Sequence, residues 1–304
     1  MDTDLDPFFI VGAPRCGTTA MSRYLGKHPN ICFSDPKETH YFLFADQTKS
    51  SDDLRREFLN AYFPHLSDEA LMIGEGSISS LYSKDALQLI LRTFRAPKFI
   101  VMLRNPVDLV YSWHAQLYYS FLEDIGDFSA AWQAQEQRAR GELIPERCPI
   151  PFALQYREIG SLGKYVEKLL EDAPREQIKI IFMEDFHKDA DAVYRECLDY
   201  LDVPYEPRRD PRKLNANKRH RFRWLGKLLA HDTRSRGSRL LNKFFKMPVV
   251  NKFQVKYWLH EFNKIEYKRP PLNPEIRSML IEEFRDDIAK LAKVTGRNLD
   301  HWLQ

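Results

Sequence analysis

The chain has 304 residues, of which 43% are hydrophobic, so it can bury a sizeable core, which argues against global disorder. Its four cysteines and nine histidines lack the spacings of a zinc site, and the cysteines do not predict a disulfide framework. The formal net charge is +3, but residues 206–269 contain nineteen Lys and Arg against five Asp and Glu. This local excess predicts an anionic partner for that stretch.

The first residues of the chain do not look like a targeting segment. Residues 1–6 are acidic, and the first apolar run is far too short to span a membrane. We therefore expect neither a signal peptide nor a membrane anchor, and we expect the protein to be cytoplasmic.

Short apolar runs alternate with amphipathic segments along the chain. Four of these runs predict buried strands at Phe8–Gly12, Leu71–Gly74, Lys98–Arg104 and Gln177–Met183. Apolar residues at helical spacing predict helices at Thr19–His28, Asp85–Phe94, Pro106–Ser120 and Asp189–Leu201, and a last helix capped by Asn273 and ended by Gly296. The alternation predicts an α/β fold, a central parallel β-sheet flanked by helices, with ligands at the carboxyl ends of the strands.

The first predicted strand leads into a glycine-rich loop. Residues 8–25 read FFIVGAPRCGTTAMSRYL, so a buried strand ends at Gly12 and a helix begins after Gly17. Glycines permit a tight turn, and the free amides at a helix N-terminus bind phosphate. The spacing is that of a P-loop, but Thr18 stands where a Walker lysine is needed, which argues against an ordinary ATPase or kinase.

The third predicted strand leads into a second candidate anion site. Residues 98–114 read KFIVMLRNPVDLVYSWH, with Arg104 at the strand end and Ser112 in the second turn of the next helix. An arginine fork and a serine hydroxyl at one strand end suit a second phosphate. Two alternatives are an ion pair of Arg104 with Asp108, and a bond of Ser112 to its own helix backbone.

The PRCGTT loop resembles the 5′-phosphosulfate loop of the sulfotransferase superfamily, which commonly reads PKSGTT or PRSGTT. The resemblance implies that the donor 3′-phosphoadenosine 5′-phosphosulfate is held by Arg15, Cys16, Gly17, Thr18, Thr19 and Ala20, and its 3′-phosphate by Arg104 and Ser112. The resemblance also implies that the reaction needs no metal ion. Arg15 stands where lysine is common, and arginine is a poor proton donor. Ala20 replaces a frequent tryptophan, so an adenine contact is missing there.

Residues 35–42, DPKETHYF, resemble the KExHFF-like segment of heparan-type and many bacterial sulfotransferases, in which the glutamate is the general base. The resemblance implies that Glu38 is the base, with His40 orienting it if the segment is extended. An ion pair of Glu38 with Lys37 is the structural alternative, and His114 is a rival base. Residues 75–83, EGSISSLYS, resemble a GEASPSYLYS segment, with Gly76 standing where glycan-type enzymes often have lysine.

Residues 206–270 show no clean sheet pattern, and we expect them to form an α-rich basic lid or insertion on a single domain, residues 1–304. Residues 215–223, NANKRHRFR, resemble a loop that covers the nucleotide, which implies that Lys218, Arg219 and Arg221 are candidates for the 3′-phosphate. Two alternatives are a solvated basic helix and a membrane-surface or polyanion-binding face, because Trp224, Leu225, Leu228 and Leu229 interleave with the basic residues.

Together these features predict an enzyme that transfers sulfonate to a hydroxyl, or to an amine, of a small-molecule or saccharide acceptor, leaving 3′-phosphoadenosine 5′-phosphate. We expect no nucleic-acid partner. A small-molecule kinase and a non-catalytic nucleotide-binding protein are the alternative functions.

Overall fold

The computed structural model describes residues 5–208, 218–229, 258–259, 261–267 and 269–304. The chain forms two compact units. The first unit comprises Met1–Trp113, Gln155–Leu214 and Asn273–Gln304, and the second comprises His114–Leu154 and Asn215–Leu272. Among the described helices, none is both long enough and apolar enough to cross a membrane.

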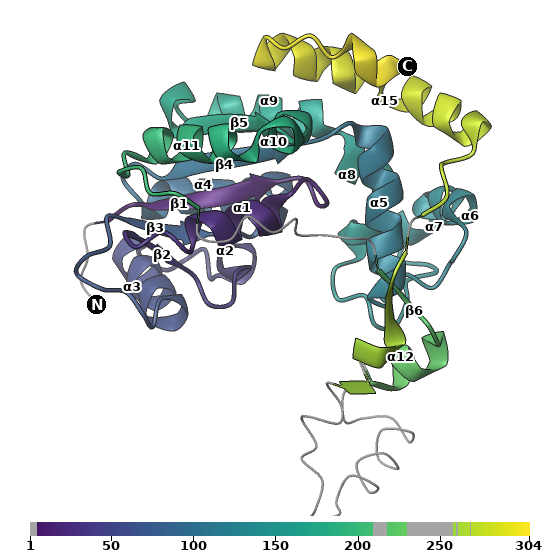
Figure 1. Ribbon diagram of the computed structural model, residues 1–304, viewed down its shortest axis with the longest axis horizontal. Helices are drawn as coiled ribbons and strands as arrows, with labels where there is room; N and C mark the ends of the chain where they lie inside the picture. The colour runs from purple at the N-terminus through teal and green to yellow at the C-terminus, as the bar shows by residue number, and fades with distance from the viewer. Residues whose placement is uncertain (1–4, 209–217, 230–257, 260, 268) are drawn as a thin grey trace, which may run out of the picture. The chain divides into compact units, whose positions relative to one another are not determined.

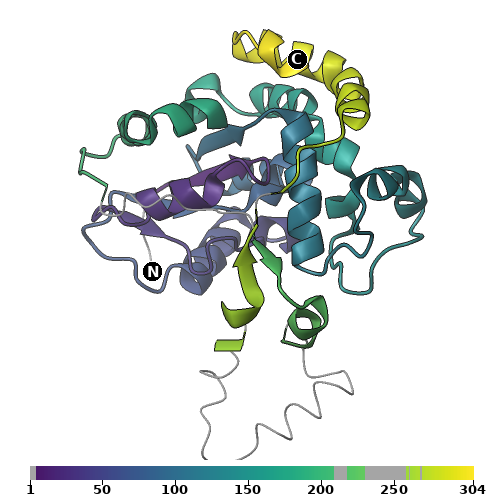
Figure 2. The same ribbon diagram turned by 45° about the vertical axis from the view of Figure 1, so that its right-hand side comes forward.

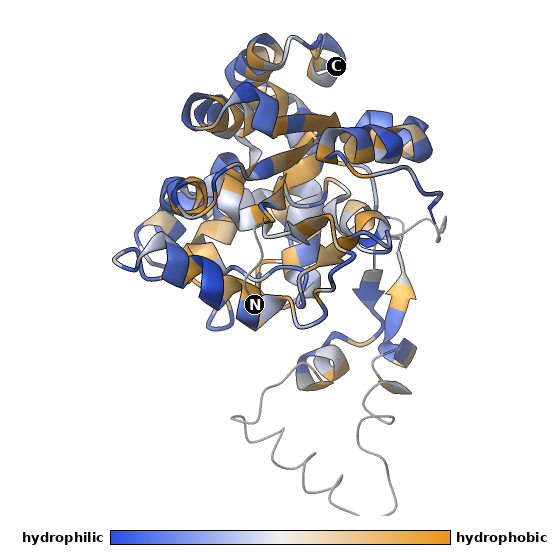
Figure 3. Cartoon of the chain, turned by 90° about the vertical axis from the view of Figure 1, so that its left-hand side faces the viewer, coloured by the Kyte–Doolittle hydropathy of each residue, from blue (hydrophilic) through white to orange (hydrophobic). Residues whose placement is uncertain are grey.

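A five-stranded parallel β-sheet forms the core of the first unit (Figure 1). Its strand order is β2-β3-β1-β4-β5, and the strands are β1 Pro7–Gly12, β2 Ile31–Phe33, β3 Met72–Glu75, β4 Lys98–Leu103 and β5 Ile178–Phe182. Every residue of β1 is buried, as expected for a parallel sheet covered on both faces. The strands are among the most hydrophobic parts of the chain (Figure 3). The predicted α/β fold with a central parallel sheet is therefore confirmed.

Helices cover this sheet and connect its strands. They are α1 Thr18–Leu25, α2 Tyr41–Phe44, α3 Ser51–Tyr62, α4 Lys84–Thr93, α8 Tyr156–Gly160, α9 Leu162–Asp172, α10 Met183–Lys188, α11 Ala190–Leu201 and α15 Pro274–Thr295, together with the short 3₁₀ helices η1 Ile78–Tyr82, η3 Arg175–Gln177 and η4 Asp300–Leu303. The helix α5, Pro106–Tyr119, begins in the first unit and ends in the second.

The C-terminal helix α15 follows its sequence pattern. The Asn273 side chain accepts a hydrogen bond from the Glu275 N–H, and Gly296 ends the helix in the left-handed conformation at φ 68°. The buried face packs against α9. A Cβ at Gly163 would lie 2.3 Å from the Asp287 carbonyl oxygen, so only glycine permits this close approach. The Asp287 carboxylate also accepts the Gly163 and Lys164 N–H groups at 2.7 and 2.9 Å, which caps α9.

The second unit contains α6 Phe128–Gln133, α7 Gln135–Ala139, η2 Pro151–Leu154 and α12 Arg223–Leu229. Two further strands, β6 Lys218–His220 and β7 Lys264–Glu266, pair antiparallel although they lie far apart in sequence (Figure 2). This pair was not predicted, because each strand has only three residues and their pairing depends on contacts that the sequence pattern does not reveal. Much of the predicted α-rich segment, residues 209–217 and 230–257, lies outside the described residues.

A buried ion pair lies in the interior of the second unit. Arg138 donates to both carboxylate oxygens of Glu123 at 2.7 and 2.6 Å, and both side chains are fully buried. The ring of His220 stacks on Tyr119 and Phe121, with centroid distances of 4.4 and 4.9 Å. Aromatic and charged groups therefore stabilise this unit together.

Candidate functional site

Three neighbouring parallel strands of the first unit end at the same edge of the sheet. The strand β1 lies between β3 and β4, and its register pairs Phe9 with Glu75 and Gly12 with Met102. The loops that follow these strands carry the PRCGTT sequence, the EGSISSLYS sequence and Arg104. Because the carboxyl ends of parallel strands form the usual ligand site of such folds, this edge is the candidate functional site.

The glycine-rich loop has the geometry of a phosphate cradle. A Cβ at Gly12 would lie 2.7 Å from the Met102 nitrogen and 2.8 Å from its carbonyl oxygen, so the loop leaves β1 in close contact with β4. Gly17 adopts the left-handed conformation at φ 84° and begins α1. The N–H groups of Thr18 and Thr19 have no acceptor among the described residues. Free amides at a helix N-terminus are suited to binding an anion.

Two other loop residues are buried. Cys16 lies in the core, and burial raises the pKa of its thiol to about 12. The thiol is therefore protonated at neutral pH, and Cys16 contributes through the loop backbone and packing. Ala20 is also buried, in the first turns of α1.

The structure brings the two predicted anion motifs into contact. Arg15 donates from Nε to the Ser112 hydroxyl at 3.0 Å, and Arg104 donates from Nη1 to the Arg15 carbonyl oxygen at 3.3 Å. Burial, followed by repulsion from Arg104, lowers the pKa of Arg15. Two guanidinium groups held close together repel each other, and an anion bound between them would relieve that repulsion.

Both structural alternatives for the second motif are wrong. The Asp108 carboxylate lies 3.3 Å from the Arg277 guanidinium, and Arg104 has no ion pair with a carboxylate among the described residues. Ser112 is buried and accepts from Arg15, a residue of the phosphate loop. Arg104 and Ser112 therefore both contact Arg15 of the glycine-rich loop, and their binding of a 3′-phosphate stays a prediction.

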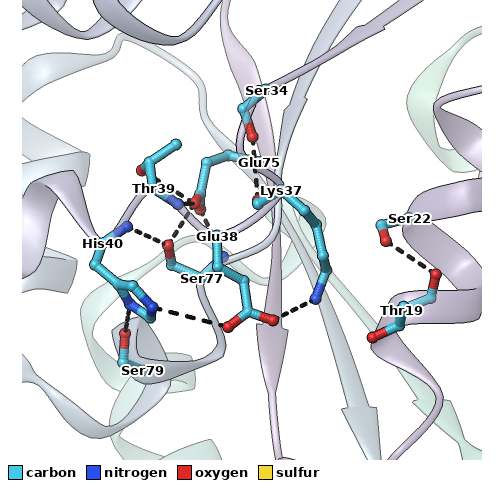
Figure 4. A network of polar contacts seen from close by, with 10 residues as sticks. All are labelled: Thr19, Ser22, Ser34, Lys37, Glu38, Thr39, His40, Glu75, Ser77 and Ser79. Atoms are coloured by element: carbon cyan, nitrogen blue, oxygen red, sulfur yellow. Dashed lines mark hydrogen bonds and ion pairs between the residues drawn. The ribbon is translucent and has the colours of Figure 1, made fainter. Parts of the chain in front are cut away.

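Glu38 lies between two basic side chains (Figure 4). The Lys37 ammonium is 2.7 Å from Oε1 of Glu38, and Nε2 of His40 is 3.8 Å from Oε2. The segment is not extended at His40, which has a left-handed backbone at φ 51° and precedes α2. His40 nevertheless lies beside Glu38. The Glu38 side chain is 34% exposed, so it is accessible to a substrate.

Sequence reasoning missed Glu75, whose buried carboxylate organises the Glu38 loop. Its oxygens accept the Thr39 N–H at 2.9 Å, the Thr39 hydroxyl at 3.1 Å and the Ser77 N–H at 2.8 Å, and it also accepts from the Ser77 hydroxyl. Ser77 in turn accepts the His40 N–H at 2.8 Å. Burial raises the pKa of Glu75, and these hydrogen bonds oppose the shift. In the sequence, the signal that could have identified Glu75 was the position of a carboxylate directly at the end of a buried strand.

His114, the rival base, belongs to the second unit and is buried. Its Nε2 lies 2.9 Å from the carbonyl oxygen of Ile125. Burial lowers the pKa of His114. The charge of Arg138 lowers this pKa further, whereas the charge of Glu123 raises it. The imidazole is therefore neutral at neutral pH and holds the loop that contains Ile125.

The titration of His114 predicts a pH dependence of stability. An unfolded histidine titrates near about pH 6.5. Because the folded pKa is lower, the folded state binds fewer protons, so this stabilisation is present above that pH and is lost as the pH falls through the folded pKa. We expect the free energy of unfolding to fall more steeply in the wild type than in H114Q between about pH 7.5 and about pH 5, measured by urea denaturation. Parallel pH profiles would contradict this.

The candidates in the basic segment belong to the second unit, whereas the phosphate loop belongs to the first. Lys218 lies in β6, and its side chain is outside what the structure describes, as are residues 215–217. The exposed Arg219 places its guanidinium 4.6 Å from the centroid of the Tyr267 ring, and Arg221 lies 4.7 Å from that of Phe262. Trp224 is exposed and Leu229 is buried. The role of this segment remains a prediction.

In the described part of the chain, no cluster of His, Cys, Asp and Glu has an arrangement that could bind a metal ion. The phosphate loop, the Arg104–Ser112 pair and the Glu38 loop are thus the groups that this edge of the sheet offers. These groups are suited to binding an anion next to an accessible carboxylate.

Comparison with known proteins identifies the family of the chain. The profile of the family described as "Sulfotransferase domain" matches residues 5–236. Bifunctional heparan sulfate N-deacetylase/N-sulfotransferase 3 of Homo sapiens is 22% identical over 315 residues, which cover 99% of this chain and 31% of that protein. Carbohydrate sulfotransferase 15 of Mus musculus is 23% identical over 253 residues, which cover 66% of this chain and 44% of that protein. The chain therefore spans less than half the length of these relatives.

A solved structure supports the fold assignment. The sulfotransferase from Alicyclobacillus acidocaldarius matches with a TM-score of 0.66 at 22% sequence identity, covering 98% of this chain and 99% of that chain. At this level of identity the match establishes the fold.

Proposed function

The chain belongs to the sulfotransferase family, and on that premise we propose that it transfers the sulfonate of 3′-phosphoadenosine 5′-phosphosulfate to an acceptor. The observation that carries the proposal is the contact between the two anion motifs, Arg15 Nε to Ser112 Oγ at 3.0 Å. A donor with phosphates at both its 5′ and 3′ positions requires two adjacent anion sites. An ATP-dependent kinase would instead require a loop lysine, and Thr18 occupies that position.

In this proposal the phosphate loop binds the 5′-phosphosulfate through the free N–H groups of Thr18 and Thr19. Arg104 and Ser112 bind the 3′-phosphate. Arg15 lies between the two groups and stabilises negative charge without giving up a proton. Lys218 and Arg219 are proposed as further contacts to the donor, on the resemblance of their segment alone.

Glu38 is the proposed general base. The acceptor oxygen attacks sulfur in line with the leaving 5′-phosphate oxygen, and the acceptor proton passes to the Glu38 carboxylate. The new sulfur–oxygen bond forms as the old one breaks, so charge and protons balance without a metal ion. The partial exposure of Glu38 leaves an approach for the acceptor.

We propose a saccharide or another polyhydroxylated small molecule as the acceptor. The relatives named above carry heparan sulfate and carbohydrate in their names. Transfer to an oxygen and transfer to an amine use the same base, and the acceptor panel must include both.

The experiment is transfer of ³⁴S-labelled sulfonate from the donor to a panel of saccharides, amino sugars and phenols, read by mass spectrometry. Calorimetry with the donor and with ATP runs in parallel. We expect donor binding, no ATP turnover with Mg²⁺, and a labelled product from at least one saccharide. ATP turnover would establish the kinase alternative, and tight donor binding without transfer to any acceptor would favour the non-catalytic one.

Replacing Arg104 with Ala tests the second anion site. Losing a charge-assisted hydrogen bond to a phosphate costs roughly 1.5–3 kcal/mol, so the Kd for 3′-phosphoadenosine 5′-phosphate should rise roughly tenfold to hundredfold. Arg277→Ala is the matched control, because Arg277 pairs with Asp108 in the same unit. Equal Kd values for the two variants in calorimetry would remove Arg104 from the donor site.

A further inference from the structure

We propose that Lys37 is the cation that contacts the transferring sulfonate at the acceptor side of the site and aligns Glu38 with the sulfur atom. The inference rests on the proposed function and adds a residue to it. Three observations carry it: the path of the Lys37 side chain across Gly76, the bond of its ammonium to Glu38, and the engagement of Arg15 elsewhere.

The position of Lys37 is determined by its backbone. The Lys37 carbonyl oxygen accepts hydrogen bonds from the Gly76 N–H at 3.0 Å and from the Ser34 hydroxyl at 3.1 Å. The bond from Gly76 holds Lys37 beside the loop that follows β3. A Cβ at Gly76 would lie 2.8 Å from Cε and 3.3 Å from Cγ of Lys37. The lysine side chain therefore runs through the space that any side chain at position 76 would occupy.

The Lys37 ammonium points to the proposed base. Its Nζ is 2.7 Å from Oε1 of Glu38, and the side chain is 24% exposed. Figure 4 shows His40 on the other side of the same carboxylate. An ammonium has three N–H donors, and among the described residues Glu38 is the only acceptor of Lys37. Lys37 can thus bind a sulfonate oxygen and Glu38 at the same time.

The other cation of the loop is engaged differently. Arg15 donates to Ser112 and holds Arg104 through its carbonyl oxygen, on the β4 side of β1. Lys37 lies on the β3 side, against Gly76. The site therefore has cations on both sides of the phosphate loop strand, and Lys37 is the cation that bonds directly to Glu38.

The role of Lys37 in transfer follows from this geometry. The acceptor oxygen forms a bond to sulfur, the sulfur–oxygen bond to the 5′-phosphate breaks, and the acceptor proton goes to Glu38. Lys37 keeps its protons and donates hydrogen bonds to a sulfonate oxygen and to Glu38 throughout. A group that bonds to both the base and the sulfonate restricts their separation, which is the kind of positioning that accelerates reactions between bound groups.

The first test separates sulfonate contact from structural support. Glu38→Gln slows turnover, so donor affinity can be measured in that background with and without Lys37→Met. We expect the Kd for 3′-phosphoadenosine 5′-phosphosulfate to rise roughly tenfold, and the Kd for 3′-phosphoadenosine 5′-phosphate, which lacks the sulfonate, to change less than about twofold. Equal changes for both nucleotides, or no change for either, would overturn the inference.

The second test moves the lysine side chain from position 37 to position 76, in the loop that follows β3. Lys37→Met and Lys37→Ala should each lower kcat roughly 10²–10³-fold, and Lys37→Arg should restore part of it. In the double variant Lys37→Ala/Gly76→Lys, the new side chain enters the space that Lys37 vacates, and it should recover at least about tenfold in kcat over Lys37→Ala. If kcat does not recover in the double variant and Lys37→Met is as active as the wild type, the proposed role of Lys37 is rejected.

These results are distinguishable from failure of the proposed function. A wild-type chain that does not bind the phosphosulfate donor, or an unimpaired Glu38→Gln variant, contradicts the proposed reaction or its base. Normal transfer by the wild type together with normal transfer by Lys37→Met contradicts the Lys37 assignment alone. Circular dichroism of each variant checks its fold, and Lys37→Gln replaces Lys37→Met if the latter does not fold.

Discussion

Glu38→Gln is expected to lower kcat for sulfonate transfer by roughly 10²–10⁴-fold, the usual contribution of a general base. The amide retains the size of the side chain and its hydrogen bond to the Lys37 ammonium, but it cannot accept the acceptor proton. The affinity for 3′-phosphoadenosine 5′-phosphate should stay within about twofold of the wild type, because the nucleotide is held by other residues. Steady-state transfer assays and calorimetry measure the two quantities.

A matched control distinguishes the base from any exposed carboxylate. Glu69 is exposed in the same unit, and Glu69→Gln should retain full activity. His40→Ala should cause a smaller loss than Glu38→Gln, since His40 lies 3.8 Å from the carboxylate and is proposed only to orient it. If Glu38→Gln transfers sulfonate as fast as Glu69→Gln, Glu38 is not the base.

Glu123→Ala is expected to destabilise the second unit by roughly 3–5 kcal/mol, the cost of leaving one charge of a buried pair without its partner. Arg138 is fully buried, and the variant removes the two bonds that Glu123 accepts, while the Leu143 carbonyl oxygen at 3.3 Å and the exposed Asp124 carboxylate at 3.9 Å stay near the guanidinium. Hydrogen exchange of residues 128–139, followed by mass spectrometry, measures the stability of this unit separately from the sheet.

The control for this prediction is an ion pair at the surface. Lys290 and Glu167 lie 2.8 Å apart with both side chains about 40% exposed, so Glu167→Ala should cost at most about 1 kcal/mol. The double variant Glu123→Leu/Arg138→Met should recover most of the loss, because it removes both buried charges. A change in protection below about 1 kcal/mol in Glu123→Ala would show that the pair does not stabilise the unit.

Features that depend on local sequence were predictable. The four long strands carry apolar runs, and the last helix has Asn273 before it and Gly296 after it, so hydrophobic pattern and capping were sufficient. The strand–loop–helix structure around Gly12 and Gly17 was predictable because both glycines stand where the backbone turns between a buried strand and a helix. The contacts of Arg104 and Ser112 with Arg15 agree with their positions after β4 and in α5, and their role stays a prediction.

Features that depend on contacts between distant segments were not predictable. β2 has only three residues, too few for a pattern. Asp108 was a plausible partner of Arg104 four residues away, but its partner is Arg277, which lies on α15. Glu75 is identified as the organiser of the Glu38 loop only when the segments around Thr39 and Ser77 are seen together.

The sheet order has a consequence for how acceptor specificity can change. β1 lies between β4, which is followed by the proposed 3′-phosphate residue Arg104, and β3, which ends at Glu75 beside the Glu38 loop. These two groups of residues lie on either side of β1, and different loops carry them. If the proposed function holds, the segments around residues 34–62 and 76–83 could be replaced to suit new acceptors while the proposed donor site stays unchanged. For protein engineering, the same division makes those segments the natural unit of exchange between related enzymes, with Lys37 and Gly76 transferred together.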